Sequence, residues 1–274
     1  MKPREIVAFL SDYGLEDEFV GVCHGVMLKI SPQLRILDIH HNILRQRIRH
    51  GAIVLQQSMP YMPECVHLAV VDPGVGTGRK AVAIESNWGE IFVGPDNGLL
   101  MPAVLETGGV KRAFSITDER FLLTPISRTF QGRDIFAPAA AHIANGVDPS
   151  EFGPPLDASE LVCLEMPSAW VHDDHLHAEV LQVDRFGNLQ FDLERDQLEE
   201  VGLLNGSNLE VRLEGHRVSV PLGAAFGDVP AGEFVMIEDS YRYLSLAINN
   251  GDAAAKLRAG AGSTAIIGGA YTSD

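Results

Sequence analysis

The first half of the chain alternates short apolar runs with stretches of helical spacing. Five β-type runs are expected as strands, namely EIVAFL, LRILDI, VHLAVV, AVAIES and EIFVGP. Apolar residues recur at helical spacing in three stretches, DEFVGVCHGVMLKI, residues 47–59 and RDIFAPAAAHIANG, the last with an Asn-Gly stop signal. Strands that alternate with helices favour a mainly parallel sheet covered on both faces. We therefore expect an α/β domain over residues 1–155.

The pattern changes after the proline-rich turn Phe152-Gly153-Pro154-Pro155. The rest of the chain is a series of short β-type runs separated by turn residues, with little helical periodicity. These runs are HAEVLQVD, GNLQFDL, NLEVRL, HRVSVPL, EFVMIE and YLSLAIN. The pattern predicts an all-β domain over residues 160–274, in the form of a small barrel.

Composition narrows the class of protein. The 274 residues are 46% hydrophobic and 21% charged, which is typical of a soluble globular protein. The net charge of −16 argues against nucleic acid or an anionic membrane surface as a partner. Three cysteines without a CxxC pair argue against a disulfide framework. The first apolar run is too short for a signal peptide and no stretch approaches a membrane span, so we expect a cytoplasmic protein.

Acidic residues follow several of the expected strands. Asp12, Asp38, Asp72 and Asp96 each stand at or just after the end of an apolar run. In open parallel sheets, ligands bind outside the carboxyl ends of the strands, so these side chains indicate a polar, hydroxylated or cationic ligand. The competing interpretation is that some of them cap a following helix or turn, which is a common role of aspartate.

The stretch VVDPGVGTGRK, residues 70–80, first suggests a phosphate-binding loop. A P-loop places Lys and then Ser or Thr after its last glycine, whereas Arg79, Lys80 and Ala81 stand here. The run that follows is a β-type run, so no helix N-terminus faces a phosphate. The P-loop interpretation fails, and Asp72 and Arg79 remain to be explained.

Seven stretches, in order from about residue 6 to about residue 250, together resemble one family. They are SDYGLEDEFVG, DIHHNI, VVDPGVGTGRK, GPDNGLL, TFQGRDIFAP, VDRFGN and DSYRYLSLAINNG. In this combination the chain resembles the S-adenosylmethionine (SAM) hydroxide adenosyltransferases, which hydrolyse SAM to adenosine and L-methionine and are related to the fluorinase and chlorinase. The resemblance implies an α/β domain, a β-barrel domain and a homotrimer with active sites at subunit interfaces. It also implies displacement at the ribose C5′ carbon, with SAM as substrate and no cofactor.

The resemblance assigns three residues to the attacking water. Asp72 and Arg79 match the family's Asp and Arg, so that a carboxylate orients the water and a guanidinium supports that carboxylate. The alternative is a structural ion pair that braces a glycine-rich turn. The third member is His in the family and Gln131 here. Glutamine can orient a water but cannot carry a proton, and loss of an acid/base group can cost about 10²–10⁴ in rate. A SAM-binding protein with little or no turnover is therefore a second hypothesis.

A halide-dependent reaction is a third, weaker hypothesis. In the halogenating relatives an aromatic residue replaces the Asp. A carboxylate about 4 Å from a halide costs on the order of 4 kcal/mol at an effective dielectric constant near 20. Asp72 therefore favours water over halide.

The remaining substrate contacts are also implied by the resemblance. Asp12 matches the acid that accepts both ribose hydroxyls, and Ser240 the serine at the methionine carboxylate, although Tyr241 replaces the arginine that follows it in the halogenases. Asp17 and Asp184 match the acids near the methionine ammonium, and Asn188 matches the amide at the adenine edge. The rings near the substrate are matched by Phe130, Phe186 and Phe226. For Phe186 and Phe226 the alternative is plain core packing in the barrel.

No metal site is expected. The run HDDHLH, residues 172–177, carries three histidines, but its place before an expected strand is typical of an exposed turn. His40 and His41 end a strand beside the expected site, and we interpret them as packing residues or as supports of residues that contact the substrate.

Overall fold

The computed structural model describes residues 2–204 and 206–270. The chain divides into two units, Met1–Glu165 and Met166–Asp274, each with its own hydrophobic core. Residues 156–165, after the proline-rich turn, also belong to the first unit. Pro155–Leu156 pairs with a strand of its sheet. No helix in the described part of the chain combines the length and the hydrophobicity that crossing a bilayer requires.

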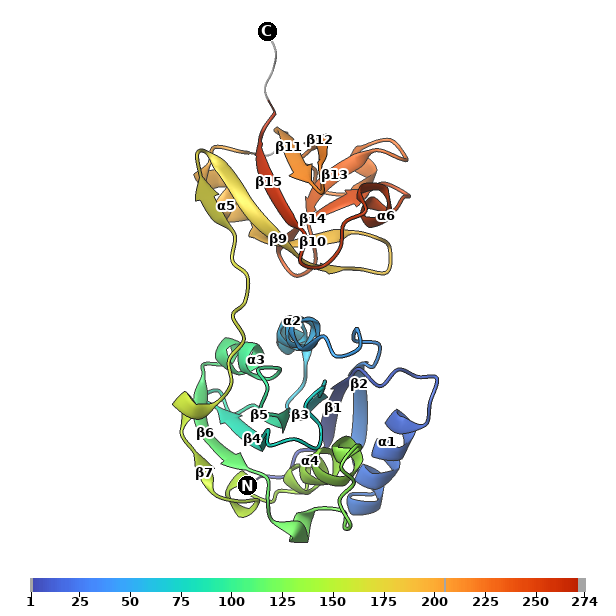
Figure 1. The fold of residues 1–274 in the computed structure, drawn as a ribbon, viewed down its shortest axis with the longest axis vertical. Helices are drawn as coiled ribbons and strands as arrows, with labels where there is room; N and C mark the ends of the chain where they lie inside the picture. The colour runs from blue at the N-terminus through green and yellow to red at the C-terminus, as the bar shows by residue number, and fades with distance from the viewer. Residues whose placement is uncertain (1, 205, 271–274) are drawn as a thin grey trace. The chain divides into compact units, whose positions relative to one another are not determined.

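A seven-stranded sheet with the order β2-β1-β3-β5-β4-β6-β7 forms the centre of the first unit (Figure 1). Its strands are β1 (Ile6–Ser11), β2 (Arg35–His40), β3 (Val66–Val70), β4 (Ala81–Ser86), β5 (Ile91–Pro95), β6 (Val110–Ser115) and β7 (Pro155–Leu156). Strands β2, β1, β3 and β5 are parallel, while β4, β6 and β7 join in antiparallel pairs. Residues 87–90 between β4 and β5 are too few for a parallel crossover, so these strands form a hairpin.

Helices cover both faces of this sheet, as the alternation of strands and helices predicts. Four α-helices are present: α1 (Phe19–Ile30), α2 (Ile48–Ser58), α3 (Met101–Glu106) and α4 (Ala137–Ala144). Val7 and Phe9 of β1 join the core formed with α1 and α4, whereas Leu10 joins the core formed with α2 and α3. This separation follows from the alternation of side chains along a strand. The α/β class is confirmed; β6, β7 and the short α3 are additions that the sequence pattern did not predict.

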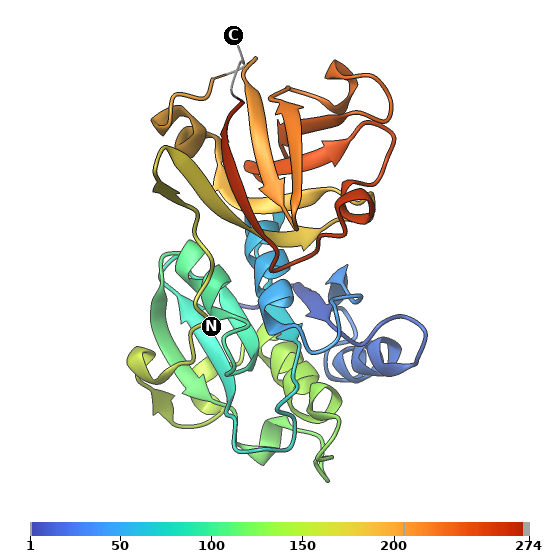
Figure 2. The ribbon, with the colours of Figure 1, turned by 45° about the horizontal axis from the view of Figure 1, so that its top comes forward.

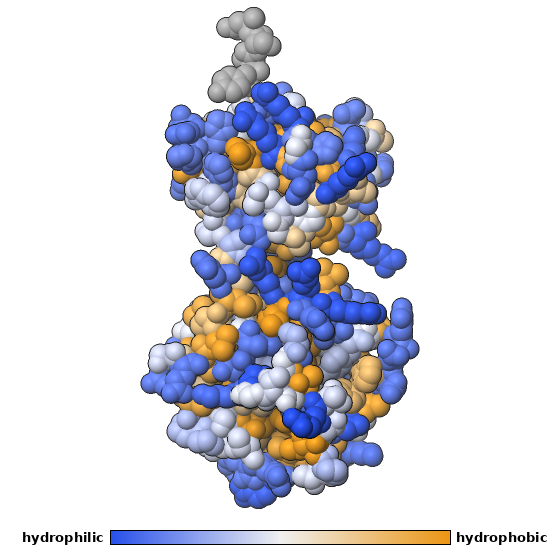
Figure 3. Space-filling view, in the orientation of Figure 1, coloured by the Kyte–Doolittle hydropathy of each residue, from blue (hydrophilic) through white to orange (hydrophobic). Residues whose placement is uncertain are grey.

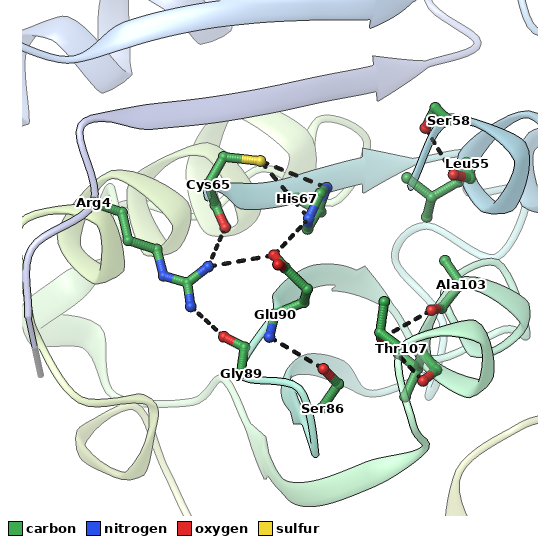
Figure 4. Close-up of polar contacts among 11 residues, drawn as sticks. Arg4, Leu55, Ser58, Cys65, His67, Ser86, Gly89, Glu90, Ala103 and Thr107 are labelled. Carbon is green, nitrogen blue, oxygen red and sulfur yellow. Dashed lines mark hydrogen bonds and ion pairs between the residues drawn. The ribbon is translucent and has the colours of Figure 1, made fainter. Parts of the chain in front are cut away.

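A buried polar network closes the edge of the sheet at which β1, β3 and β5 begin (Figure 4). The Arg4 guanidinium donates to the carbonyl oxygens of Cys65 and Gly89 and pairs with Glu90 at 3.5 Å. Glu90 Oε2 lies 3.1 Å from Nε2 of His67, whose side chain is fully buried. Because burial raises the pKa of the Cys65 thiol to about 12, this cysteine stays protonated and unreactive at neutral pH. The network therefore serves to join three strands at the edge opposite their carboxyl ends.

The second unit is an antiparallel, nearly closed barrel with the order β12-β11-β15-β9-β10-β14-β13 (Figure 1 and Figure 2). Its strands are β8 (Trp170–His172), β9 (His175–Val183), β10 (Leu189–Glu194), β11 (Asn208–Leu213), β12 (His216–Pro221), β13 (Phe234–Glu238), β14 (Tyr243–Ile248) and β15 (Thr264–Gly269). A bridge between Leu222 and Met236 brings the two ends of the sheet together. The six predicted strands are all present, so the predicted all-β barrel is confirmed.

Short elements complete the second unit. Helices α5 (Arg195–Glu200) and α6 (Ala253–Leu257) lie between strands, and β8 pairs with the start of β9. The HDDHLH run forms this hairpin, with Asp173 and Asp174 at its turn in left-handed backbone conformations, so the predicted exposed turn is confirmed. On the face shown in Figure 3, hydrophilic residues surround smaller apolar areas in both units.

Candidate active site

Three aspartates stand at the carboxyl ends of neighbouring strands in the first unit. Asp12 follows β1, Asp72 comes just after β3, and Asp96 follows β5. The amide of Asp12 donates to Val70 O of the neighbouring strand at 3.4 Å. Because these strands are parallel, their ends meet at one edge of the sheet, which is where α/β proteins bind ligands.

Asp72, Arg79 and Gln131 are joined directly. Arg79 Nε lies 3.0 Å from each carboxylate oxygen of Asp72, and Nη2 donates to Oδ2 of the same group. Nη2 also donates to Gln131 Oε1 at 2.5 Å. The guanidinium stacks on the Phe136 ring at 4.9 Å. The side chains of Asp72 and Arg79 are only 6% and 11% exposed. This fixes the carboxylate in one orientation in a largely dry environment.

The backbone around this group is tightly packed. Gly76 has a φ of 76°, and a Cβ at this position would lie 2.4 Å from the carbonyl oxygen of Arg128. Glycine is therefore required where the turn after Asp72 meets the segment that leads to Gln131. Gln131 stands at the start of a π-helical turn, Gly132–Phe136, a distortion often found at functional sites. The buried carboxylate of Asp134 holds this segment by accepting from the Ser127 amide at 2.8 Å.

Asp12 is not a helix cap. The N-cap of α1 is Glu18, so the helix-capping interpretation is wrong for this residue. One carboxylate oxygen of Asp12 accepts from the Gln46 amide at 2.9 Å. Burial raises the pKa of Asp12, and the charge of Asp72 raises it further, against the lowering effect of the Gln46 hydrogen bond. The second oxygen has capacity to accept hydroxyl donors.

Aromatic side chains lie beside these acids. Phe130 packs edge-on against Tyr13 and Phe19 at centroid distances of 5.7 and 5.0 Å. Tyr13 is a residue that the sequence analysis missed, although it directly follows Asp12. A Cβ on Gly132 would lie 1.9 Å from the Tyr13 hydroxyl, which therefore points at the segment carrying Gln131. Asp17 is exposed in the loop before α1.

The other two strand-end aspartates serve elsewhere. Asp96 Oδ1 accepts from the Val162 amide at 2.9 Å, so it anchors the segment that follows β7. Asp38 lies within β2 and contacts two histidines. The geometry thus separates Asp12 and Asp72 from two residues with the same sequence pattern.

In the second unit, the remaining predicted residues line one pocket of about 440 Å³. Asp184, Phe186 and Asn188 come from the β9–β10 turn, Phe226 from the turn before β13, and Ser240 from the β13–β14 turn. Phe186 and Phe226 are 75% and 44% exposed, so the core-packing alternative is wrong for both. Separate turns of the barrel thus converge on a single concave, partly aromatic surface.

Carboxylates shape two of these turns. Asp184 accepts from the amides of Phe186 and Asn188 and from the Asn188 side chain, at 2.7 to 2.9 Å. Asp239 accepts from the Tyr241 amide at 2.8 Å and so defines the turn that presents Ser240. Asp239 was not predicted from the sequence, although an Asp side chain that accepts from the amide two residues later is a known turn signal.

Comparison with known proteins agrees with this geometry. Residues 7–153 match the model described as SAM hydroxide adenosyltransferase N-terminal domain, and residues 178–266 match the corresponding C-terminal domain. A protein of Salinispora tropica named (R)-S-adenosyl-L-methionine hydrolase is 42% identical, with 93% of this chain and 94% of that protein covered.

A fluorinase and a solved structure are also similar to this chain. A fluorinase of Actinopolyspora mzabensis is 30% identical over 90% of this chain and 91% of its own. The crystal structure of an uncharacterized conserved protein from Thermotoga maritima matches with a TM-score of 0.90 and 34% identity, covering 96% of this chain and 99% of that one. The chain therefore belongs to the SAM hydroxide adenosyltransferase family.

Proposed function

We propose that this protein hydrolyses (R)-S-adenosyl-L-methionine to adenosine and L-methionine. The observation that carries the proposal is the buried Asp72 carboxylate, fixed by Arg79 at the ligand-binding edge of the sheet and close to Asp12. The names of relatives that are 40–42% identical support the substrate and its sulfonium configuration.

In the proposed reaction, Asp72 holds a water in line with the C5′–S bond. The water oxygen forms a bond to C5′ while the C5′–S electron pair passes to sulfur, and the departing methionine is a neutral thioether. One water proton leaves by way of the carboxylate to solvent. The sulfonium is already an activated leaving group, so the reaction needs no cofactor. Because the substrate loses its positive charge in the transition state, a site that excludes water favours the reaction.

The geometry also bears on the halide alternative. Asp72 is ion-paired and only 6% exposed, so its negative charge would face any anion bound in the place of the water. Two unit charges about 4 Å apart repel by on the order of 4 kcal/mol at an effective dielectric constant near 20, which is an upper bound here because Arg79 is paired with Asp72. Water as the attacking group avoids this cost.

Other residues are assigned to substrate binding. Asp12 accepts the ribose hydroxyls through the oxygen that does not bind the Gln46 amide. In the barrel pocket, Asn188 reads the adenine edge and the exposed rings of Phe186 and Phe226 stack near the base. Asp17 and Asp184 are assigned to the methionine ammonium, and Ser240 to the methionine carboxylate. Phe130, which packs beside Tyr13, is assigned to substrate contact.

The test is incubation with (R)-SAM followed by chromatography of the products. We expect equal amounts of adenosine and methionine, and no halogenated adenosine in chloride or fluoride buffer. Asp72→Asn should lose adenosine formation while still binding SAM in calorimetry. Asp96→Asn is the matched control, because this strand-end aspartate anchors the Val162 amide and should leave the rate unchanged. Full activity of Asp72→Asn would overturn the proposal.

Gln131 favours one alternative, a binding protein that turns SAM over very slowly. Its amide oxygen accepts from Arg79, so it supports the ion pair but cannot relay a proton. Comparison of the wild type with Gln131→His over long incubation separates the two functions. A slow wild type and a fast variant would show that the imidazole limits the chemistry. Similar rates in both would show that support of Arg79 suffices.

We also propose that the active protein is a homotrimer, as the resemblance implies. Light scattering should give three times the chain mass. When Asp72→Ala and Asn188→Ala chains are unfolded and refolded together, activity should return above that of either parent. A monomer mass with no recovery would contradict the trimer.

A further inference from the structure

Three side chains that commonly bind metal ions meet outside the residues assigned to catalysis. His24 comes from α1, Asp38 from the edge strand β2, and His41 from the residue just after that strand. Figure 1 shows α1 and β2 at the same edge of the first unit. One ligand atom from each residue lies within 4.8 Å of the other two. Asp38 and His41 are three residues apart on the same segment, whereas His24 lies 14 residues before Asp38, so the fold is needed only to bring His24 to the other two.

The distances suit a small cation with little rearrangement. Asp38 Oδ1 lies 2.9 Å from His24 Nε2 and 3.0 Å from His41 Nε2. Tetrahedral zinc with bonds of about 2.0–2.1 Å separates its ligand atoms by roughly 3.3–3.4 Å. A shift of a few tenths of an ångström would bring both separations from Asp38 Oδ1 to the zinc value, and the two imidazole nitrogens lie within 4.8 Å of each other.

The imidazole of His41 is held in the orientation that a metal ligand needs. Its Nδ1 and the Ser11 hydroxyl share a hydrogen bond of 2.7 Å, and its ring packs edge-on against Phe9 at 4.7 Å. Metal-binding histidines usually have such a partner on the nitrogen that does not bind the ion. The His41 side chain is 2% exposed. The buried Nε2 faces Asp38 Oδ1 at 3.0 Å and has no other polar partner among the described residues.

The cluster also has an open side. The Asp38 side chain is 43% exposed and that of His24 is 27% exposed, so an ion can enter and keep water as its remaining ligand. Two imidazoles and one carboxylate form a ligand set that suits zinc and neighbouring first-row dications rather than calcium or magnesium, which prefer oxygen ligands.

We propose that His24, Asp38 and His41 form a binding site for one zinc-like dication. This departs from the expectation, drawn from the sequence, that the protein binds no metal. The site is structural in its effect. The Ser11 hydroxyl that holds His41 also accepts from the Tyr13 amide at 3.4 Å, and the Gly14 amide donates to His41 O at 2.7 Å. A bound ion would therefore fix the turn that contains Asp12.

The test is titration of the chelator-treated full chain with zinc chloride in calorimetry, and with cobalt chloride in visible spectroscopy. We expect one equivalent of zinc per chain, a cobalt spectrum of low-coordinate nitrogen and oxygen ligation, and a higher melting temperature with zinc. Ser11→Ala removes the hydrogen-bond partner of His41 and should weaken zinc binding by about 10–100-fold. His24→Ala and Asp38→Asn each remove a ligand and should weaken zinc binding at least as much. Melting curves in chelator establish that each variant is folded.

Two matched controls address adventitious sites. His172 lies in the exposed β8–β9 hairpin and Cys163 is an exposed thiol, so both are plausible surface ligands for zinc. His172→Ala and Cys163→Ser should leave the affinity and the stoichiometry unchanged. The proposal is overturned if the wild type binds no zinc at micromolar concentration. It is equally overturned if binding survives in folded His24→Ala and Asp38→Asn chains, or if it is lost in either control.

Discussion

Replacement of Arg79 by methionine tests the central feature of the site. In the wild type, both oxygens of Asp72 accept from this guanidinium, and Gln131 Oε1 accepts from it as well. Methionine keeps much of the apolar contact with Phe136 but removes the charge and every donor. The variant therefore leaves a carboxylate that is 6% exposed without its counterion.

The expected cost follows from the burial of the pair. Removal of one partner from a buried ion pair destabilises a protein by about 3–5 kcal/mol, because the other charge remains desolvated and unpaired. In a domain of this size, each kcal/mol lowers the melting temperature by about 2–4 °C. We expect the melting temperature of the first unit to fall by roughly 6–20 °C. Adenosine formation should fall together with it, because the Asp72 carboxylate loses its fixed orientation.

A double-mutant cycle separates the ion pair from simple loss of packing. Stability is measured by urea unfolding for the wild type, Arg79→Met, Asp72→Asn and the double variant. The double variant buries no unpaired charge, so its loss should be smaller than the sum of the single losses by about 1–3 kcal/mol. Losses that add within about 0.5 kcal/mol would refute the idea that the pair is coupled in a dry environment.

Three further predictions follow from other contacts. Asp12→Asn should weaken SAM binding in calorimetry by about 10-fold or more. The affinity of the wild type should fall as the pH drops through the raised pKa of Asp12, whereas the affinity of the variant should not show this fall. Glu90 has a lowered pKa because hydrogen bonds to His67 and Arg4 outweigh burial. Glu90→Gln should therefore cost about 1–3 kcal/mol at neutral pH, and this cost should disappear as the pH falls through the lowered pKa, measured by urea unfolding. Gly132→Ala should destabilise the first unit by about 1–3 kcal/mol in the same assay, because the new methyl group would meet the Tyr13 hydroxyl.

The sequence pattern predicted most of the elements but not how the sheet is ordered. Runs such as EIVAFL and VHLAVV are apolar on both faces, which identifies buried parallel strands, and these are β1 and β3. Strand β6, VKRAFS, carries two charged residues that form ion pairs with Glu85 and Asp148 at the antiparallel side of the sheet. These charges interrupt the apolar run, so the sequence pattern did not indicate a strand there. Position in the sheet depends on contacts between strands, which no local pattern records.

The sequence by itself also determined which residues to consider for the chemistry. The motifs that carry the family resemblance placed Asp72, Arg79 and Gln131 in one site, and in the structure Arg79 donates hydrogen bonds to both of the others. Four aspartates shared the same place at strand ends, and the strand pattern alone could not rank them. The family resemblance singled out Asp12 and Asp72.

Only the tertiary structure decided what each of these aspartates contacts. Asp72 meets a guanidinium, Asp96 meets the Val162 amide, and Asp38 meets His24 and His41. The physical reason is that a carboxylate's role depends on the charges and donors within a few ångströms, and these come from segments up to 66 residues away. A strand pattern determines the position of a side chain along the strand, whereas the packing of helices and loops determines which groups contact it.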